Sequence, residues 1–267
     1  MVSIIIPYYN GDKFIEETIE SCFNQTYRDL EVIIVDDNSP RPFPNYLLER
    51  YKKITLISNS VNQGFCRNSN IGVKTASGEY IIVLGQDDVL LADHIEKMLK
   101  SFDDNVVVAY CGYHLIDENS VDYRVCKNND EREVTMEDLA KHSIHTCGLM
   151  MQRDAFIKVG GYPEDFGNFG EWDLWIKLCE IGRIVYNTET HGLYRRHRNN
   201  ITNNFQDYNQ YVALYRYHKR CKFSALAKCD MPIPLKLISY SKVLFWCLKR
   251  KIIIVLRRVG IYKGRKS

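Results

Sequence analysis

The sequence predicts an α/β protein with a mostly parallel central sheet flanked by helices. Its first 113 residues alternate five apolar runs with helix-like segments, which is the pattern of repeated βαβ units. The first run, residues 2–9 (VSIIIPYY), is apolar apart from Ser3 and rich in isoleucine. Such a run is typical of a parallel strand that helices cover on both faces.

The other elements follow from periodicity along the chain. Apolar side chains at 14, 15, 18, 19, 22 and 23 share one face of a helix. Further strands are expected at residues 30–37, 54–59, 79–88 and 105–113, and further helices within residues 41–53, 64–78 and 93–102. Beyond these, residues 147–162 predict a strand and a short helix that two glycines stop, residues 170–182 predict an amphipathic helix, and residues 194–204 predict a loop.

Composition places the chain among ordinary globular proteins. Its 267 residues suffice for one large domain, or for one domain with an appendage, and 45% of them are hydrophobic. The nine cysteines contain no CxxC pair, so we expect reduced thiols and not a disulfide framework. The first residues enter a strand at once and show no basic segment or cleavage site, so we expect no signal peptide.

Acidic residues follow two of the expected strands directly. Asp36–Asp37 closes the second strand and Asp87–Asp88 closes the fourth, while Pro7–Tyr9 closes the first. The carboxyl ends of parallel strands meet at one edge of a sheet, where ligands bind, so we expect these residues along one rim. Paired carboxylates there suit Mg²⁺ or Mn²⁺ carrying phosphates. The alternative is a solvated loop in which Asp88 or Asp93 caps the next helix.

Several other reaction classes lack their motifs. No GxGxxG follows the first strand and no GxxxxGK[ST] occurs, so the phosphate cradles of dinucleotide-binding and P-loop proteins are missing. No nucleophile elbow frames a serine. A cleft lined with carboxylates remains the best candidate site.

Five phrases in order resemble the family 2 inverting glycosyltransferases over roughly residues 1–200. They are VSIIIPYYNGDKFIEETIESCFNQTY, LEVIIVDDNS, NQGFCRNSNIGVKTASGEYIIVLGQDD, GLMMQRDAFIKVGGY and EWDLWIKL. The resemblance implies the GT-A fold, a nucleotide-sugar donor, a divalent metal and a single displacement that inverts configuration at the sugar carbon.

The resemblance also implies roles for individual residues. Asp88 matches the metal-ligating acid of a DxD-like motif, and Asp87 the acid that contacts ribose or sugar. The remaining matches place donor contacts at Pro7, Tyr9, Asp37, Arg67 and Asn70, with Asp37 bonded to the base and Asp36 a weaker candidate. This chain departs from the common Asp-x-Asp-Asp pattern, because Gly85 and Gln86 precede its two acids.

The same resemblance places the catalytic base at Glu171, in GEWDLW. An acceptor hydroxyl must lose a proton as it attacks, and a carboxylate within hydrogen-bond reach can take it. The alternative is an ordinary acid in the first turn of a helix, and Asp173 is the competing candidate. Trp172 is a core residue or an acceptor contact. His197 matches a position near the diphosphate, or belongs to a basic surface patch.

The C-terminal segment is strongly basic. Residues 235–267 contain ten Lys/Arg and no Asp or Glu, so the remaining 26 Lys/Arg face all 33 Asp/Glu of the chain. Apolar runs between the basic clusters are too short to span a bilayer and fit a helix lying in the headgroups of an anionic membrane. A nucleic-acid partner is disfavoured by the density of tryptophan, phenylalanine and isoleucine, and a helix packed on the catalytic body is the structural alternative.

Together these observations predict a metal-dependent (Mn²⁺ or Mg²⁺) inverting glycosyltransferase. It would move a sugar from a nucleotide-diphosphate donor to a hydroxyl of a polyprenyl-diphosphate-linked glycan in surface polysaccharide synthesis. UDP-hexose is the first candidate donor. We expect a nucleotide-sugar-binding half at 1–112, an acceptor-binding half at 113–230 and a membrane-associating tail at 231–267, on the cytoplasmic face of the inner membrane. The alternatives are a sugar nucleotidyltransferase, which lacks its Gly-rich loop here, and a non-catalytic nucleotide-sugar or glycan-binding module.

Overall fold

The computed structural model describes residues 1–126, 133–166, 170–198, 200, 208–230 and 232–258. These residues form two compact units, which are considered separately. The first comprises residues 1–134 and 144–196, and the second residues 135–143 and 197–267. The division predicted from the sequence, into a donor-binding half, an acceptor-binding half and a tail with boundaries after residues 112 and 230, is defined by ligand binding and stays a prediction.

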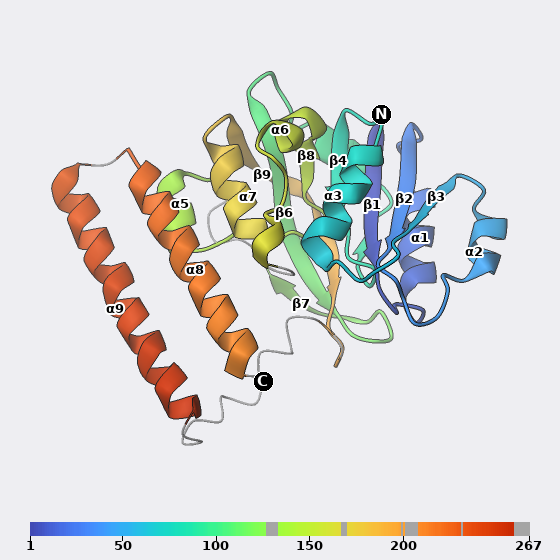
Figure 1. Cartoon of the computed structure of the whole chain (residues 1–267). Coiled ribbons are helices and arrows are strands. Elements are labelled where there is room, and N and C mark those ends of the chain that lie inside the picture. Colours follow the sequence, from blue (N-terminus) through green and yellow to red (C-terminus); the bar gives the residue numbers. More distant parts are fainter. Residues whose placement is uncertain (127–132, 167–169, 199, 201–207, 231, 259–267) are drawn as a thin grey trace. The chain divides into compact units, whose positions relative to one another are not determined.

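The first unit is built on a twisted nine-stranded sheet with the order β3-β2-β1-β4-β8-β6-β9-β5 and with β7 paired to β6 (Figure 1). Its strands are β1 (Val2–Tyr8), β2 (Leu30–Asp36), β3 (Ile54–Ser58), β4 (Tyr80–Val83), β5 (Val89–Leu90), β6 (Val106–Ile116), β7 (Asp122–Cys126), β8 (Met150–Gln152) and β9 (Arg183–Arg195). Its helices are α1 (Ile15–Phe23), α2 (Asn45–Arg50), α3 (Phe65–Thr75), α4 (His94–Leu99), α6 (Arg153–Lys158), the 3₁₀ turn η1 (Glu164–Phe166) and α7 (Glu171–Cys179).

The first four strands confirm the predicted βαβ arrangement. Strands β3, β2, β1 and β4 are neighbours, and each adjacent pair is parallel. Alternate residues of β1 face opposite sides: Ile4 and Ile6 pack in a core with Ile15 and Ile19 of α1. On the other side, α3 crosses the front of the sheet in Figure 1 and approaches closely at Gly72. A Cβ there would stand 2.4 Å from the side chain of Ile5, so only glycine fits.

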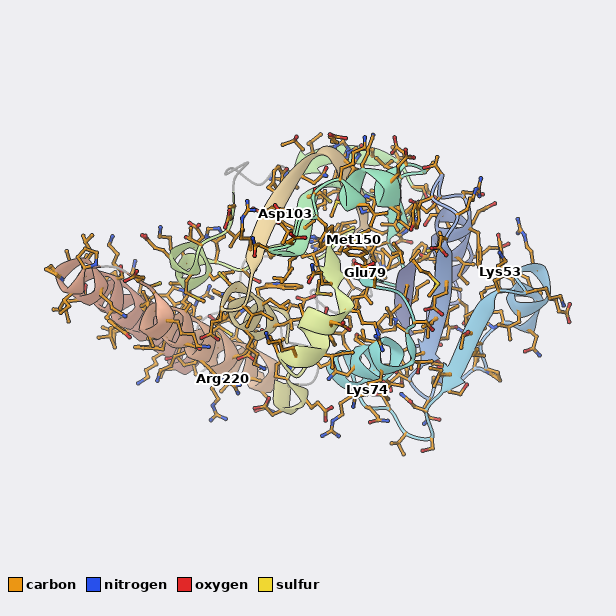
Figure 2. All side chains as sticks on the ribbon, turned by 90° about the horizontal axis from the view of Figure 1, so that it is seen from above. Lys53, Lys74, Glu79, Asp103, Met150 and Arg220 are labelled. Carbon is orange, nitrogen blue, oxygen red and sulfur yellow. The ribbon has the colours of Figure 1, made fainter. Side chains whose placement is uncertain are left out.

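Beyond β4 the sheet contains antiparallel as well as parallel strand pairs. Strand β8 is antiparallel to both β4 and β6, so it separates the fourth expected strand from the fifth. Its Met150 is fully buried at the centre of the sheet (Figure 2). The long strand β9, parallel to β6 and antiparallel to the short β5, lies in a segment where no strand was expected. Its placement brings Arg195 beside the loop that follows β4.

The described residues of the second unit form the helices α5 (Met136–Lys141), α8 (Tyr208–Lys228) and α9 (Ile233–Arg258). Helices α8 and α9 pack through stacked rings of Tyr215 and Trp246, whose centroids are 5.8 Å apart. Arg250 Nη1 donates a 2.7 Å hydrogen bond to the hydroxyl of Tyr211. Among the described helices, none combines the length and the apolar character that crossing a bilayer requires.

Candidate nucleotide-sugar site

The rim predicted from the sequence is present at the carboxyl ends of β1, β2 and β4. Tyr8 lies opposite Asp36 in the parallel register, and Ile5 lies opposite Val83. Backbone hydrogen bonds continue past the strand ends, from Asp37 N to Tyr8 O (2.8 Å) and from Leu84 N to Ile5 O (2.9 Å). The first loop, the Asp37 region and the acid loop of residues 85–88 therefore leave the sheet at the same edge.

Gln86 joins the first loop to the acid loop. Its side-chain amide forms two hydrogen bonds with the backbone of Tyr9: Tyr9 N donates to Oε1 (2.8 Å) and Nε2 donates to Tyr9 O (3.2 Å). The Thr18 hydroxyl of α1 donates to the Gln86 carbonyl (3.0 Å). A Cβ on Gly11 would stand 2.4 Å from the Gln86 amide, so the first loop fits closely around it. From the sequence Gln86 was only a departure from the family pattern.

Asp37 is buried and organises the loop before α3. Its Oδ1 accepts hydrogen bonds from Gln63 N (2.8 Å) and Asn59 Nδ2 (3.0 Å), and its Oδ2 accepts one from Gly64 N (2.8 Å). A carboxylate oxygen offers two acceptor positions, so Oδ2 retains capacity for a further donor such as a base N–H. This geometry is compatible with the predicted base contact, which stays a prediction.

The two carboxylates of the acid loop converge beside Gly85. A Cβ on Gly85 would stand 2.7 Å from Asp88 Oδ2 and 3.1 Å from Asp87 Oδ1. Both carboxylates therefore pack against Gly85, where the side chain of an acid at this position would begin. Burial, and after it the charge of Asp87, raises the pKa of Asp88 well above its ordinary value. Asp88 Oδ1 accepts a hydrogen bond from Arg195 N (3.1 Å).

Glu171 is the first residue of α7 and is held by Thr146, whose hydroxyl donates to Glu171 Oε1 (3.1 Å). Burial raises the pKa of the Glu171 carboxyl, while the Thr146 hydrogen bond opposes the rise. A raised pKa suits a general base, which must accept a proton and release it later. The helix N-terminus also favours a carboxylate there.

Residues 146 and 147 connect Glu171 with the acid pair. Thr146 bonds Glu171, and the thiol of the next residue, Cys147, lies close enough to the Asp88 carboxylate to lower the pKa of Asp88 against the effect of burial. Burial and the nearby Asp88 charge raise the pKa of the Cys147 thiol well above its ordinary value, so the thiol keeps its proton and stays a donor. Two consecutive residues, about 3.8 Å apart at Cα, therefore touch both candidate groups. Neither was identified from the sequence.

Other predicted site residues have structural partners. Arg67 is half-exposed and its Nε lies 3.1 Å from Glu164 Oε2. The buried Asn70 amide bonds the backbone of Tyr162 twice, donating to its carbonyl (2.9 Å) and accepting from its N–H (3.0 Å). Asn70 therefore links α3 to the segment before α7. Its predicted contact with the donor stays a prediction.

The remaining predicted residues divide between rim, core and second unit. Pro7 and Tyr9 lie at the end of β1, with Tyr9 about half exposed. Trp172 is buried, as is Asp173, the competing base, whose Oδ2 lies 2.8 Å from Lys177 Nζ. His197 belongs to the second unit, so its predicted place near a diphosphate stays a prediction.

Comparison with known proteins decides the family. Residues 3–160 match the model of "Glycosyl transferase family 2". The chain belongs to glycosyltransferase family 2. Among the relatives of this family 2 chain is the "uncharacterized glycosyltransferase RP339" of Rickettsia prowazekii, 32% identical over 212 residues. The match covers 76% of this chain and 66% of the length of RP339.

Solved structures confirm the predicted GT-A fold for the family 2 chain. Staphylococcus aureus TarS, residues 1–349, in complex with UDP-GlcNAc matches with a TM-score of 0.71 at 18% identity, covering 93% of this chain and 72% of that one. The mannosyltransferase PcManGT of Pyrobaculum calidifontis, in complex with GDP-Man and Mn²⁺, matches with a TM-score of 0.65 at 17% identity. That match covers 98% of this chain and 76% of that one.

The acid loop of this family 2 chain fits a divalent cation bound together with phosphates. Within the part of the chain that the structure describes, no group of three His, Cys, Asp or Glu side chains surrounds one point. The pair Asp87 and Asp88 nevertheless turns one carboxylate oxygen each toward Gly85. Magnesium and manganese often take one or two protein carboxylates and complete their shell with phosphate oxygens and water. Two convergent acids are enough for that arrangement.

Proposed function

We propose that this chain is an inverting glycosyltransferase that transfers a hexose from a UDP-sugar to a hydroxyl of a lipid-linked oligosaccharide in surface polysaccharide synthesis. The observation that carries the proposal is the link through residues 146 and 147. Through Thr146 and Cys147, the partly buried carboxylate of Glu171, whose pKa is raised, is connected to the acid pair at the sheet edge. Base and diphosphate site must lie on either side of one sugar carbon in such a reaction.

The residues divide the chemistry between them. Glu171 takes the proton of the acceptor hydroxyl, whose oxygen forms a bond to the anomeric carbon from the face opposite the diphosphate. The bond between that carbon and the diphosphate oxygen breaks, and its electron pair leaves with the nucleoside diphosphate. Attack opposite the leaving group inverts the configuration. Asp88 would hold Mn²⁺ or Mg²⁺, and Asp87 beside it would contact the ribose or sugar of the donor; the metal, when bound, would neutralise charge on the departing diphosphate.

Donor identity rests on the rim residues and on the structural neighbours. Asp37 would accept a hydrogen bond from the base, and Pro7, Tyr9 and Arg67 would line the nucleotide. TarS holds UDP-GlcNAc and PcManGT holds GDP-Man with Mn²⁺ in their structures, which supports a nucleotide-sugar donor and a divalent metal for this chain. UDP is the first candidate nucleotide.

A thermal-shift screen of nucleotide sugars with and without Mn²⁺ tests the donor assignment. A ligand that binds only the folded state raises the melting temperature. We expect UDP-sugars at about 100 times their dissociation constant to add roughly 2.7 kcal/mol of stability, with the larger shift in Mn²⁺. Absence of any shift across the panel would contradict a nucleotide-sugar site.

The pH dependence of transfer should respond to Thr146. Its hydroxyl favours the charged form of Glu171 and so lowers that pKa against the effect of burial. Thr146→Val removes the donor, so the Glu171 pKa rises further and the acidic limb of kcat/KM moves to higher pH. Thr146→Ser keeps the hydroxyl and should keep the limb in place. A limb that is unmoved or shifted to lower pH in Thr146→Val would separate Glu171 from the titrating base.

Helix α9 supports attachment to an anionic membrane surface. Its buried face packs on α8 through Val243, Trp246 and Cys247. At 100° per residue the opposite face is apolar and more than half exposed, with Leu237, Leu244, Phe245, Leu248, Ile252 and Val255. Lys242, Lys249 and Lys251 lie at the edges of that face, and residues 235–267 contain no acid. An exposed apolar stripe bordered by lysines fits a helix lying among anionic headgroups.

Co-sedimentation with phosphatidylglycerol vesicles tests this attachment. The double substitution Leu244→Asp/Phe245→Asp should weaken binding at least ~10-fold, because burying each side chain contributes ~1.5–3 kcal/mol and the new charges are repelled. Val121→Asp, which removes an equally exposed apolar side chain from the first unit, is the matched control and should bind as the unsubstituted chain does. Unchanged sedimentation of the α9 variant would rule out this surface.

A further inference from the structure

Arg195, the last residue of β9, is a fully buried arginine beside the acid loop. Its Nε donates to the carbonyl of Asp87 (2.9 Å), and its own backbone N–H donates to Asp88 Oδ1 (3.1 Å). The end of β9 therefore holds Asp87 by its backbone carbonyl and Asp88 by its side-chain carboxylate. The guanidinium carbon also lies 4.8 Å from the ring centroid of Phe14, near the start of α1.

The outer edge of the guanidinium is held by a closed ring of hydrogen bonds. Nη2 donates to Glu17 Oε2 (2.7 Å) and Nη1 donates to Ser120 Oγ (2.9 Å). Ser120 in turn donates to the other oxygen of Glu17 (2.6 Å). Nη1 also donates to the carbonyl of Asp117 (2.9 Å). The acid loop, α1 and the β6–β7 turn therefore meet at one side chain.

The β6–β7 turn is shaped for this contact. Ser120 adopts a positive φ of 64°, which only a minority of non-glycine residues do. Asp117 Oδ1 holds the turn by accepting from Asn119 N (2.8 Å) and Val121 N (3.0 Å). This geometry turns the Asp117 carbonyl and the Ser120 hydroxyl toward Arg195. A charge without any exposed surface needs such complete pairing.

We propose that Arg195 is a positioning residue that sets the acid pair for the cation before the cation binds. By occupying Asp88 Oδ1 and the Asp87 carbonyl, it leaves Asp88 Oδ2 and Asp87 Oδ1 turned together toward Gly85. Its positive charge also offsets part of the repulsion between the two carboxylates while no cation is present. The inference rests on the proposed function of the acid loop and adds the residue that holds it in place.

Manganese binding to the full-length protein tests this role, measured by the loss of the free Mn²⁺ signal in electron paramagnetic resonance with UDP present. Arg195→Lys keeps the charge and the backbone N–H but has no planar fork to reach Asp87, Ser120 and Glu17 together. We expect about 10-fold weaker Mn²⁺ affinity and sugar transfer that saturating Mn²⁺ partly restores. Arg183→Lys, at the exposed opposite end of β9, is the control and should change the affinity less than 2-fold.

A second variant covers the case in which Arg195→Lys does not fold. Ser120→Gly tolerates the positive φ and removes the hydroxyl that accepts from Arg195 and donates to Glu17, while the direct Arg195–Glu17 bond remains, so we expect a 2- to 5-fold weaker Mn²⁺ affinity. Folded variants that bind Mn²⁺ as tightly as the unsubstituted protein would overturn the inference, as would absence of Mn²⁺ binding in that protein. Weakened Mn²⁺ binding in the variants of a protein that transfers no sugar would uphold the role of Arg195 and refute the proposed function.

Discussion

Replacing Glu171 by glutamine is expected to lower kcat by about 10²–10⁴-fold, the usual contribution of a general base. Glutamine keeps the shape of the side chain and can still accept the Thr146 hydrogen bond, but it cannot take the acceptor proton. Burial raises the pKa of Glu171 above its ordinary value of 4.5, so its ionised form costs stability as the pH rises through that raised pKa. The variant should therefore unfold at the same or a higher temperature at pH 7.

Two matched variants separate catalysis from folding in this experiment. Glu180→Gln changes an exposed acid at the other end of the same helix and should keep full activity. Asp173→Asn tests the competing acid, which is buried and paired with Lys177. This variant should lower the melting temperature and leave kcat close to that of the unsubstituted protein. If folded Glu171→Gln kept full turnover, or if only Asp173→Asn lost turnover, Glu171 would not be the catalytic base.

Asp88→Asn is expected to lower kcat/KM by roughly 10²–10⁴-fold. Charge stabilisation by a bound metal contributes several kcal/mol, and about 1.36 kcal/mol corresponds to tenfold in rate. The asparagine carbonyl can still accept from Arg195 N, so the loop should keep its course. Because folding buries the Asp88 charge next to Asp87, the neutral variant should melt at a higher temperature than the unsubstituted protein at pH 7 without metal.

Steady-state transfer and thermal unfolding, each with and without Mn²⁺, measure both effects. Asp93→Asn is the control: Asp93 is partly exposed, follows the same loop and pairs with Lys97 at 2.7 Å. It should change activity little, since surface ion pairs contribute at most about 1 kcal/mol. If Asp88→Asn kept its activity, or if Mn²⁺ still raised its melting temperature as much as that of the unsubstituted protein, Asp88 would not be the metal ligand.

The first half of the fold could be predicted because its signals are local. Apolar runs such as residues 4–7 and 32–35 predict buried parallel strands, and parallel strands bring their carboxyl ends to one edge. Asp37 and Asp88, 51 residues apart, could therefore be placed on the same rim without a structure. The missing acid at Gly85 was also visible, although its physical consequence, the close packing of both carboxylates against Gly85, was not.

What the sequence could not show depends on contacts between distant segments. Strand β8 is three residues long, and its antiparallel insertion between β4 and β6 follows from pairing, not from periodicity. Thr146 and Cys147 sit in an irregular segment with no motif. Arg195 belongs to the polar stretch at 194–204 that predicts a loop, yet it is the buried last residue of strand β9. Its partners come from residues 17, 87, 117 and 120, and no local pattern announces them.

The most direct test of the central claim is one transfer reaction followed by analysis of the product. Purified full-length protein would be incubated with UDP-hexoses, Mn²⁺ and a polyprenyl-diphosphate-linked glycan, and the new linkage examined by proton NMR. The account predicts Mn²⁺- or Mg²⁺-dependent release of UDP and a product whose anomeric configuration is opposite to that of the donor. A product that retains the donor's configuration, or release of inorganic pyrophosphate in place of UDP, would contradict it.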